Sequence, residues 1–324
     1  MTVTLSKATT EVDFTLLLER ADGRTFQYSR GLSTPTTSYE SASTSKLVTA
    51  VVILSLVDRG IGGLSLDSKA ADLLKWTVPA GNPASQITLR HLLSFTSGFW
   101  DEPAILNLAT YNSATVTFAQ SVQAIYDKNI GENTIPGSKF YYASTHLQIA
   151  GMMAITAGAF TDWTAVFDDF KARTGLFAHS IYDLPSPGNP RLAGGMHWTA
   201  EDYLAFLRAL YKGDILSPTM SAELWANQRG QATVGNSPIL DKMGEDWAYA
   251  LGNWVECPSA TYDAAAVSGR NSSPGAYGAY PFIDFRNGYF GILARQGALG
   301  TFPNGIELFR TIQDTAAKWA AAPN

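Results

Sequence analysis

A serine and a lysine three positions apart are the first residues of this sequence whose types and spacing could do chemistry. Ser43 and Lys46 stand directly before the apolar run Leu47–Val57, which shows no clean polar face and is followed by Asp-Arg-Gly. This pattern predicts a largely buried helix with Ser43 at its N-terminus. A cation in the first helical turn faces the positive end of the helix dipole. Lys46 therefore indicates a functional pair, in which a lysine of lowered pKa activates a serine nucleophile.

The same pair of residues also has a purely structural interpretation. Ser43 could be an N-cap worth about 1 kcal/mol, with Lys46 extending its ammonium to water. The spacing Ser-x-x-Lys also arises by chance in chains that are rich in serine. The rest of the sequence must therefore show whether Ser43 is a helix cap or a nucleophile.

Composition and charge exclude several classes of function. The 324 residues are 46% hydrophobic and 16% charged, with a formal net charge of -5, which is typical of a soluble enzyme with few surface charges. Without a cluster of Lys and Arg, neither nucleic acid nor a membrane surface is an expected partner. No apolar run reaches the roughly 20 residues of a membrane span, and the first seven residues do not resemble a signal peptide. We expect a cytoplasmic protein, or an exported one whose leader is absent from this sequence.

Cysteine and histidine usage argues against a metal enzyme. One cysteine, Cys257, excludes an internal disulfide framework and a cysteine-rich zinc site, and it is interpreted as a free thiol. The four histidines are scattered without the H-E-x-x-H spacing: His91, His146, His179 and His197. The sequence therefore predicts neither a metal nor a cofactor.

Strand patterns at both ends of the chain and helical patterns in the middle predict the fold class. The expected strands are Val12–Glu19 and Arg24–Tyr28, which form a hairpin, and Trp247–Val255, Gly278–Phe285 and Gly288–Ala294, which form an antiparallel meander. The expected helices after the first are Lys69–Trp76, Phe118–Asp127, Tyr142–Thr156, Trp163–Gly175, Thr199–Gly213 and Ile306–Ala321. The prediction is an α+β fold, an α/β/α sandwich whose antiparallel sheet comes from both termini and is flanked by helices, with an inserted all-helical region.

We expect one catalytic domain over residues 1–324. Its sheet region takes in about residues 1–60 and 245–324, and its helical region about residues 61–244. The sequence shows no internal repeat or linker, and it indicates no particular oligomeric state.

Three short motifs follow one another in the order Ser43-x-x-Lys46, Tyr142-Ala143-Ser144 and Ser273-Pro274-Gly275. Together they resemble the serine β-lactamase and penicillin-recognising superfamily, whose class A members carry Ser-x-x-Lys, Ser-Asp-Asn and Lys-Thr-Gly. The class C-like branch is the most similar, with family VIII carboxylesterases, D-aminopeptidases and 6-aminohexanoate-dimer hydrolases. Two accessory stretches, Leu89–Gly98 and Gly194–Asp202, also resemble this branch.

The resemblance implies a β-lactamase/transpeptidase-like fold and a role for each motif residue. Ser43 would attack a carbonyl carbon while Lys46 lowers the barrier to removing its proton. Tyr142 would act as phenolate or relay and return the proton to the leaving group. The oxyanion hole would consist of the backbone N–H groups of Ser43 and Ala276.

The sequence departs from the family pattern in three places, two single residues and the third motif. Phe95 stands where His is usual, Ser144 where Asn is usual, and Ser273-Pro274-Gly275 where β-lactam enzymes have Lys-Thr-Gly. The missing lysine removes a cation for a substrate carboxylate, and proline removes a hydroxyl and an N–H. This favours an esterase or small amidase. The expected substrate-binding residues are Ser144, Ser273, Gly275, Trp100 and Tyr277, with Phe99 as a further wall and Arg270 or Arg295 as a substitute carboxylate anchor.

Three hypotheses remain open at this point. The first is a serine hydrolase for a small-molecule ester or amide. The second is a β-lactamase or D-amino-acid peptidase, which a penicillin would label covalently. The third is a catalytically silent, ligand-binding relative, from which turnover that disappears in Ser43→Ala would distinguish the first two.

Overall fold

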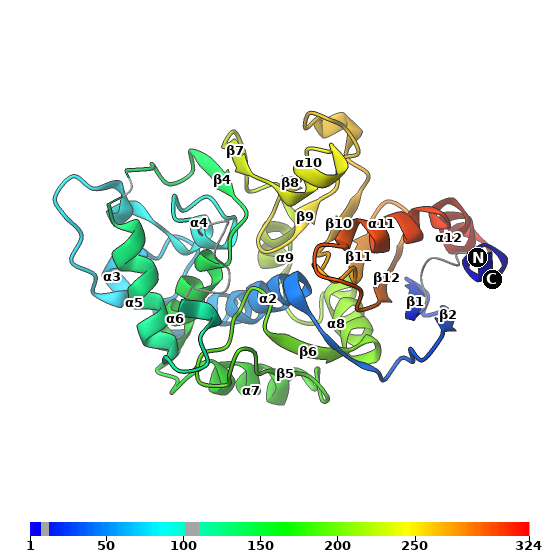
Figure 1. The fold of residues 1–324 in the computed structure, drawn as a ribbon, viewed down its shortest axis with the longest axis horizontal. Helices are drawn as coiled ribbons and strands as arrows, with labels where there is room; N and C mark the ends of the chain where they lie inside the picture. The colour runs from blue at the N-terminus through cyan, green and yellow to red at the C-terminus, as the bar shows by residue number, and fades with distance from the viewer. Residues whose placement is uncertain (8–12, 101–109, 132, 324) are drawn as a thin grey trace.

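A seven-stranded antiparallel sheet joins the two ends of the chain (Figure 1). The protein is represented by a computed structural model that describes residues 1–7, 13–100, 110–131 and 133–323. The strand order is β2-β1-β12-β11-β10-β9-β8. The strands are β1 Phe14–Arg20, β2 Thr25–Arg30, β8 Ala248–Tyr249, β9 Trp254–Val255, β10 Arg270–Ser272, β11 Tyr280–Asp284 and β12 Tyr289–Ala294. The predicted sheet from both termini is confirmed, although Val12 of the expected first strand lies outside the described residues.

Helices cover both faces of this sheet, as an α/β/α sandwich requires. Helix α8 (Ala200–Lys212) packs on β1, β11 and β12 through Tyr203, Phe206, Leu207 and Leu210, whose spacing places them on one helical face. On the other face α11 (Phe302–Arg310) contacts β11 and leads into α12 (Gln313–Ala321). Figure 1 shows α11 and α12 above the strands and α8 below them.

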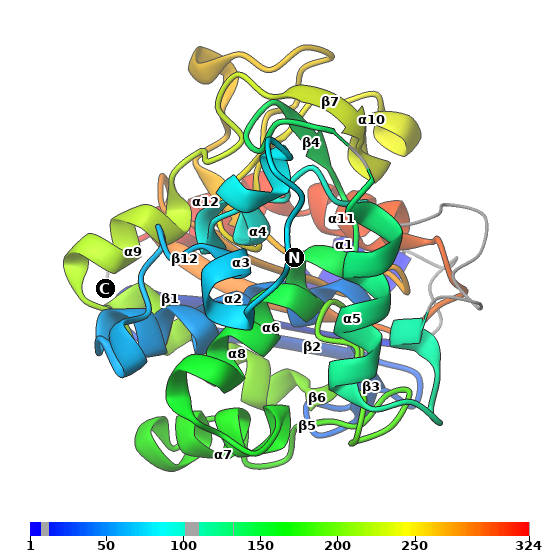
Figure 2. The same ribbon diagram turned by 90° about the vertical axis from the view of Figure 1, so that its left-hand side faces the viewer.

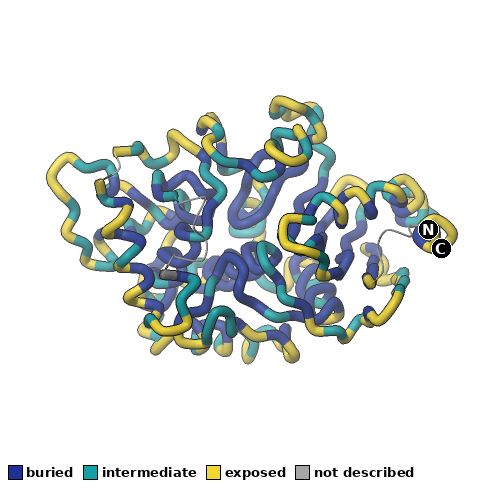
Figure 3. The backbone as a smooth tube through the Cα atoms, in the orientation of Figure 1, coloured by how far each residue is buried: buried dark blue, intermediate teal, exposed yellow. Residues whose placement is uncertain are grey.

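The buried helix predicted after Ser43 is confirmed as α2 (Ser45–Asp58). Every residue from Ser45 to Leu56 is buried, so α2 has no solvent face, and it packs against α6, α7 and α9. Figure 3 shows this helix as a dark blue stretch at the centre of the molecule. Ser43 lies just before α2, in the 3-10 turn η1 (Ala42–Thr44).

The region between the two parts of the sheet is largely helical, as Figure 2 shows. Its helices are α3 Ala70–Leu74, α4 Leu89–Leu93, α5 Phe118–Asn129, α6 Thr145–Gly158, α7 Trp163–Thr174, α9 Pro218–Trp225 and α10 Pro238–Met243. The ranges expected for α5, α7 and α8 agree with the structure within two residues. Helix α6 begins three residues later than predicted because Tyr142 and its neighbours form a loop before it.

The prediction of an all-helical region over residues 61–244 was wrong. Strands β5 (Ile181–Tyr182) and β6 (Met196–Thr199) form a small sheet with β3 (Ser38–Glu40), and β4 (Lys139–Tyr141) pairs in parallel with β7 (Thr233–Asn236). These strands have two to four residues, too few for an alternating pattern to be recognised. A short N-terminal helix, α1 (Thr2–Lys7), was also missed.

Two further elements were predicted as continuous and are interrupted. The expected strand Trp247–Val255 is a hairpin, because Gly252 turns the chain at φ 75° between β8 and β9. The expected helix Ile306–Ala321 is divided into α11 and α12 at Ile312, whose side chain is fully buried and whose φ of -118° departs from the usual helical value of about -63°. In both places, burial against neighbouring elements determines the course of the chain.

Removing the hydroxyl of Tyr249 is expected to leave stability unchanged or to raise it by about 1 kcal/mol, because no described residue accepts or donates a hydrogen bond to this buried oxygen. Tyr280 is the matched control, since it is equally buried but donates to Glu256 Oε1 at 2.6 Å. We expect Tyr280→Phe to cost about 1–3 kcal/mol by leaving Glu256 without this donor. Urea unfolding of Tyr249→Phe and Tyr280→Phe measures both values; equal losses would contradict the expectation.

Candidate active site

The structure brings the side chains of Ser43, Lys46 and Tyr142 together. The Nζ of Lys46 lies 2.8 Å from Ser43 Oγ and 4.7 Å from the centre of the Tyr142 ring. It also donates a hydrogen bond of 2.8 Å to the carbonyl of Ala193. Lys46 is only 4% exposed, so its amine does not extend to water as the structural interpretation required.

Tyr142 is held by the aromatic rings and the strand around it. Its ring stacks on Trp254 at 5.1 Å and meets the edge of Phe95 at 5.5 Å. Its N–H donates to Asn236 O at 3.1 Å, and its carbonyl accepts from Asn236 Nδ2 at 2.7 Å. Burial raises the pKa of the Tyr142 phenol, and hydrogen bonding to Ser43 and Trp254 only partly opposes this. The protonated phenol is therefore the resting form, which suits a proton relay better than a standing phenolate.

The turn that carries Ser43 is strained and is held by hydrogen bonds from neighbouring elements. Ala42 has φ 44°, a left-handed conformation that a non-glycine residue adopts only when its surroundings impose it. The Thr44 hydroxyl accepts from Trp198 Nε1 at 2.8 Å, and the Thr44 carbonyl accepts from the Tyr203 hydroxyl at 2.8 Å. Trp198 comes from β6, inside the accessory stretch Gly194–Asp202, and Tyr203 comes from α8, directly after that stretch. That part of the chain therefore positions the turn that carries Ser43.

The third motif lies directly against the same turn. Ser273 donates a hydrogen bond of 3.1 Å to the carbonyl of Ser43. A Cβ on Gly275 would lie 2.6 Å from Ser41 O and 3.0 Å from Thr44 Cγ2, so only glycine permits this approach. Glycine is therefore needed at position 275 because the main chain there lies against the turn that carries Ser43.

Ala276 follows Gly275 and so lies next to the Ser43 turn. Among the described residues no acceptor is assigned to the N–H of Ser43 or to that of Ala276. Such unpaired donors beside a nucleophile have the character of an oxyanion hole.

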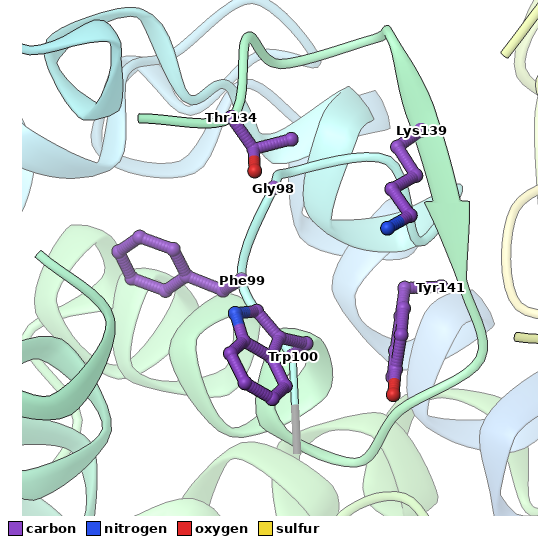
Figure 4. A pocket seen from close by; sticks show the side chains of 6 residues that line it. All are labelled: Gly98, Phe99, Trp100, Thr134, Lys139 and Tyr141. Atoms are coloured by element: carbon purple, nitrogen blue, oxygen red, sulfur yellow. The ribbon is translucent and has the colours of Figure 1, made fainter. Parts of the chain in front are cut away.

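The remaining predicted substrate residues lie in different places. Ser144 is the N-cap residue of α6 and is half-buried. Tyr277 lies beside Glu40, and burial together with that carboxylate raises the pKa of its phenol. Trp100 lines a cavity of about 310 Å³ (Figure 4). The lining of that cavity includes Phe99 but not Ser43, Lys46 or Tyr142.

The two arginines considered as carboxylate anchors are engaged elsewhere. Arg270 is buried in an ion pair with Asp284 at 3.1 Å. Arg295 donates to the carbonyl of Tyr277 at 3.0 Å and is 5% exposed. Cys257 is buried, and no cluster of potential metal ligands occurs within the described ranges.

Arg191 is a neighbour of the site that the sequence did not indicate. A Cβ on Gly194 would lie 3.3 Å from Arg191 Nε and 3.4 Å from the main chain of Ala42, so this side chain borders the nucleophile's turn. Its guanidinium donates to Asn112 Oδ1 at 2.5 Å. The only available signal was its place three residues before the Gly-Gly pair of the accessory stretch.

His146 lies beside Phe95, the residue that stands where the family pattern has histidine. It follows Tyr142 by four positions and stacks on the Phe95 ring at 4.9 Å. Its Nε2 lies 2.9 Å from the Tyr141 carbonyl, which can only accept, so Nε2 carries the proton. Its Nδ1 then accepts from Ser97 Oγ at 2.9 Å. The neutral imidazole thus links the loop after α4 to the chain beside Tyr142.

Because of His146, we expect the folded protein to lose stability in mild acid. Burial, followed by the positive charge of Lys46, lowers the pKa of His146 from 6.5 to about 4. Because the folded-state pKa lies below the unfolded one, the contribution is complete above about pH 6.5 and is lost as pH falls towards about 4. Between about pH 7.5 and 4.5, the wild type should lose roughly 2–3 kcal/mol more than His146→Gln, whose amide does not titrate. Urea unfolding at both pH values measures the difference; parallel losses would contradict it.

Comparison with known proteins decides the family. The family model described as Beta-lactamase matches residues 17–299. The chain belongs to the β-lactamase family. None of the curated proteins matches the sequence. The predicted α+β fold of the β-lactamase/transpeptidase type is therefore confirmed.

Solved structures with the β-lactamase fold match nearly the whole chain. A Bacteroides dorei DSM 17855 protein provisionally described as a β-lactamase is 26% identical with a TM-score of 0.79, covering 97% of this chain and 96% of its own. EstCE1, a hydrolase with promiscuous acyltransferase activity, is 17% identical with a TM-score of 0.76, covering 96% and 97%. The D-amino acid amidase from Ochrobactrum anthropi SV3 is 19% identical with a TM-score of 0.71, covering 95% and 97%. At these identities the latter two show the fold alone.

In the described part of this β-lactamase family member, no helix is both long and apolar enough to cross a membrane.

Proposed function

We propose that this protein is a serine hydrolase that forms an acyl-enzyme on Ser43 and acts on small esters or amides. The observation that carries the proposal is the 2.8 Å contact between Lys46 Nζ and Ser43 Oγ beside the Tyr142 ring. A nucleophile within hydrogen-bond reach of a base, with a third group nearby, is the arrangement that activated serines require. Membership of a family with hydrolytic relatives supports the same function.

Acylation begins with transfer of the Ser43 proton. In its neutral form Lys46 accepts the hydroxyl proton of Ser43 while it donates to Ala193 O, so its nitrogen is oriented before substrate arrives. The Oγ then bonds to the substrate carbonyl carbon, and the negative charge moves to the carbonyl oxygen. The N–H groups of Ser43 and Ala276 stabilise that oxyanion. Because Ser273 holds the Ser43 carbonyl, the turn that presents these donors is fixed in advance.

Release of the leaving group needs the proton that Lys46 has taken. Tyr142, protonated at rest, gives its proton to the leaving oxygen or nitrogen and takes one from Lys46. The carbonyl reforms, the bond to the leaving group breaks, and the acyl group remains on Ser43. Water then attacks the ester and returns its proton through the same groups, which frees the acid and regenerates the Ser43 hydroxyl.

The third motif favours uncharged acyl substrates over penicillins. Proline at position 274 has no N–H or hydroxyl, and Ser273 uses its hydroxyl on the Ser43 carbonyl. Arg270 is paired with Asp284 and supplies no substitute cation. A substrate carboxylate would therefore lose its water without gaining the lysine that β-lactam enzymes provide there.

Covalent labelling tests the proposed function without knowledge of the natural substrate. A fluorophosphonate should add to one serine of the wild-type protein, and peptide mass spectrometry should locate it at Ser43. Ser43→Ala should remain unlabelled, whereas Ser55→Ala should be labelled as the wild type, because Ser55 lies further along α2, where its hydroxyl donates to Val52 O and accepts from Arg173. Labelling of another serine, or none by either a fluorophosphonate or benzylpenicillin, would refute the acyl-enzyme proposal.

A further inference from the structure

The cavity lined by Trp100 lies beside β4, the strand that leads to Tyr142. Its lining residues are Gly98, Phe99, Trp100, Thr134, Lys139 and Tyr141, and its volume is about 310 Å³ (Figure 4). Along β4 the buried Phe140 shares contacts with Tyr249 and Trp254, as does Tyr142. Lys139 and Tyr141 of the same strand contribute to the cavity lining, whereas Phe140 and Tyr142 do not. The cavity is therefore separate from the candidate active site.

Two aromatic rings form walls of this cavity, and the main chain that carries each ring is hydrogen-bonded to a buried polar side chain. The Trp100 and Tyr141 rings lie 6.1 Å apart at 58°. The N–H of Trp100 donates to Asn129 Oδ1 at 3.0 Å, and Asn129 is 2% exposed. The carbonyl of Tyr141 accepts from the buried His146. The main chain at both walls is thus held without a ligand, in keeping with the largely pre-formed character of small-molecule sites.

Lys139 brings a positive charge to the mouth of the cavity. Figure 4 shows its ammonium turned towards the space between Trp100 and Tyr141. Within the described ranges Lys139 has neither an ion pair nor a hydrogen bond, so a ligand does not have to displace a described protein partner. Its methylene stem crosses Gly235 of β7, where a Cβ would lie 2.2 Å from Lys139 Cε. Gly235 thereby leaves room for the stem that directs the ammonium to the cavity.

The cavity combines features that select one class of ligand. Aromatic faces favour a flat ring, because stacked or edge contacts add to the burial of its surface. The ammonium of Lys139, which has no partner among the described residues, favours a ligand with a carboxylate and repels an amine. The volume lies at the lower end of small-molecule pockets, which limits the ligand to about one ring and its substituent.

We propose that this cavity is a binding site for small aromatic carboxylates, with the ring against Trp100 and Tyr141 and the carboxylate on Lys139. The proposal does not depend on acylation of Ser43.

Isothermal titration calorimetry with phenylacetate tests the proposal on the full chain. The wild-type protein should bind phenylacetate saturably and at least about tenfold more tightly than the neutral phenylacetamide. Lys139→Met keeps the stem and removes the charge, so it should weaken phenylacetate binding by about tenfold and leave phenylacetamide unaffected. Lys139→Arg should restore binding of the anion.

Two further variants locate the binding event. Gly235→Ala should weaken phenylacetate binding as Lys139→Met does, because the added methyl displaces the lysine stem. Ser43→Ala should bind phenylacetate as the wild type does, so that failure of the hydrolase proposal and failure of this one are distinguishable. The proposal is overturned if the wild type shows no saturable binding, if Lys139→Met and Gly235→Ala bind normally, or if Ser43→Ala abolishes binding.

Discussion

Replacing Ser43 by alanine is expected to lower kcat/KM for p-nitrophenyl butyrate by at least about 10³-fold, the scale on which loss of a nucleophile reduces turnover. The reason is that the hydroxyl oxygen 2.8 Å from Lys46 Nζ, which would attack the carbonyl carbon, is removed. Lys46→Met should lose activity to a similar extent, since the thioether fills the space of the stem but cannot accept a proton. Release of p-nitrophenol by the purified proteins provides the measurement.

A variant with both substitutions tests whether Ser43 and Lys46 act together. If Ser43 and Lys46 act as one unit, Ser43→Ala combined with Lys46→Met should be no slower than either single variant, because the second change removes a function already lost. Additive losses would indicate that the two residues contribute independently. Turnover by Ser43→Ala within about tenfold of the wild type would show that another group performs the reaction.

Gly275→Ala is expected to reduce kcat by about 100-fold, because misplacing a reacting group by about 1 Å can cost that much. The added methyl would lie 2.6 Å from the carbonyl oxygen of Ser41 and 3.0 Å from Thr44 Cγ2, so the turn carrying Ser43 has to move. Since one overpacked contact costs about 1–3 kcal/mol, the protein should remain folded. Initial rates with p-nitrophenyl butyrate and urea unfolding of the same sample separate the two effects.

Gly188→Ala is the matched control for this substitution. A Cβ on Gly188 would meet no atom within 4 Å, and its backbone does not require glycine. Its kcat and stability should match those of the wild type. If Gly275→Ala also retained wild-type kcat, contact between the third motif and the nucleophile's turn would have no part in positioning Ser43.

The sequence was sufficient to predict the centre of the site because the relevant spacing is local. Positions three apart in one helical turn face the same way, so Ser43 and Lys46 had to meet once α2 was recognised. An apolar run without a polar face was equally sufficient to predict that α2 is buried. Tyr142 came from the resemblance to a known family, and its contact with Lys46 depends on a loop far away in sequence.

The residues that hold the site in place could not be predicted in the same way. Trp198 and Tyr203 bond to Thr44 across about 150 positions, and Asn236 reaches Tyr142 from a strand too short to show a pattern. Trp100 was predicted as a substrate-binding residue from its closeness to a motif, and the cavity that it lines does not include Ser43, Lys46 or Tyr142.

The pairing of β1 with β12 has a consequence for how the protein is made. Thr15 lies opposite Ala294, so the central strands of the sheet meet only when nearly the whole chain has left the ribosome. Contacts between distant parts of a chain form slowly, because a long loop must close before they contribute. Ser43 is synthesised early, but Ser273 and Gly275, which support its turn, arrive among the last strands. Nascent chains should therefore carry Ser43 through most of translation without the contacts that position it.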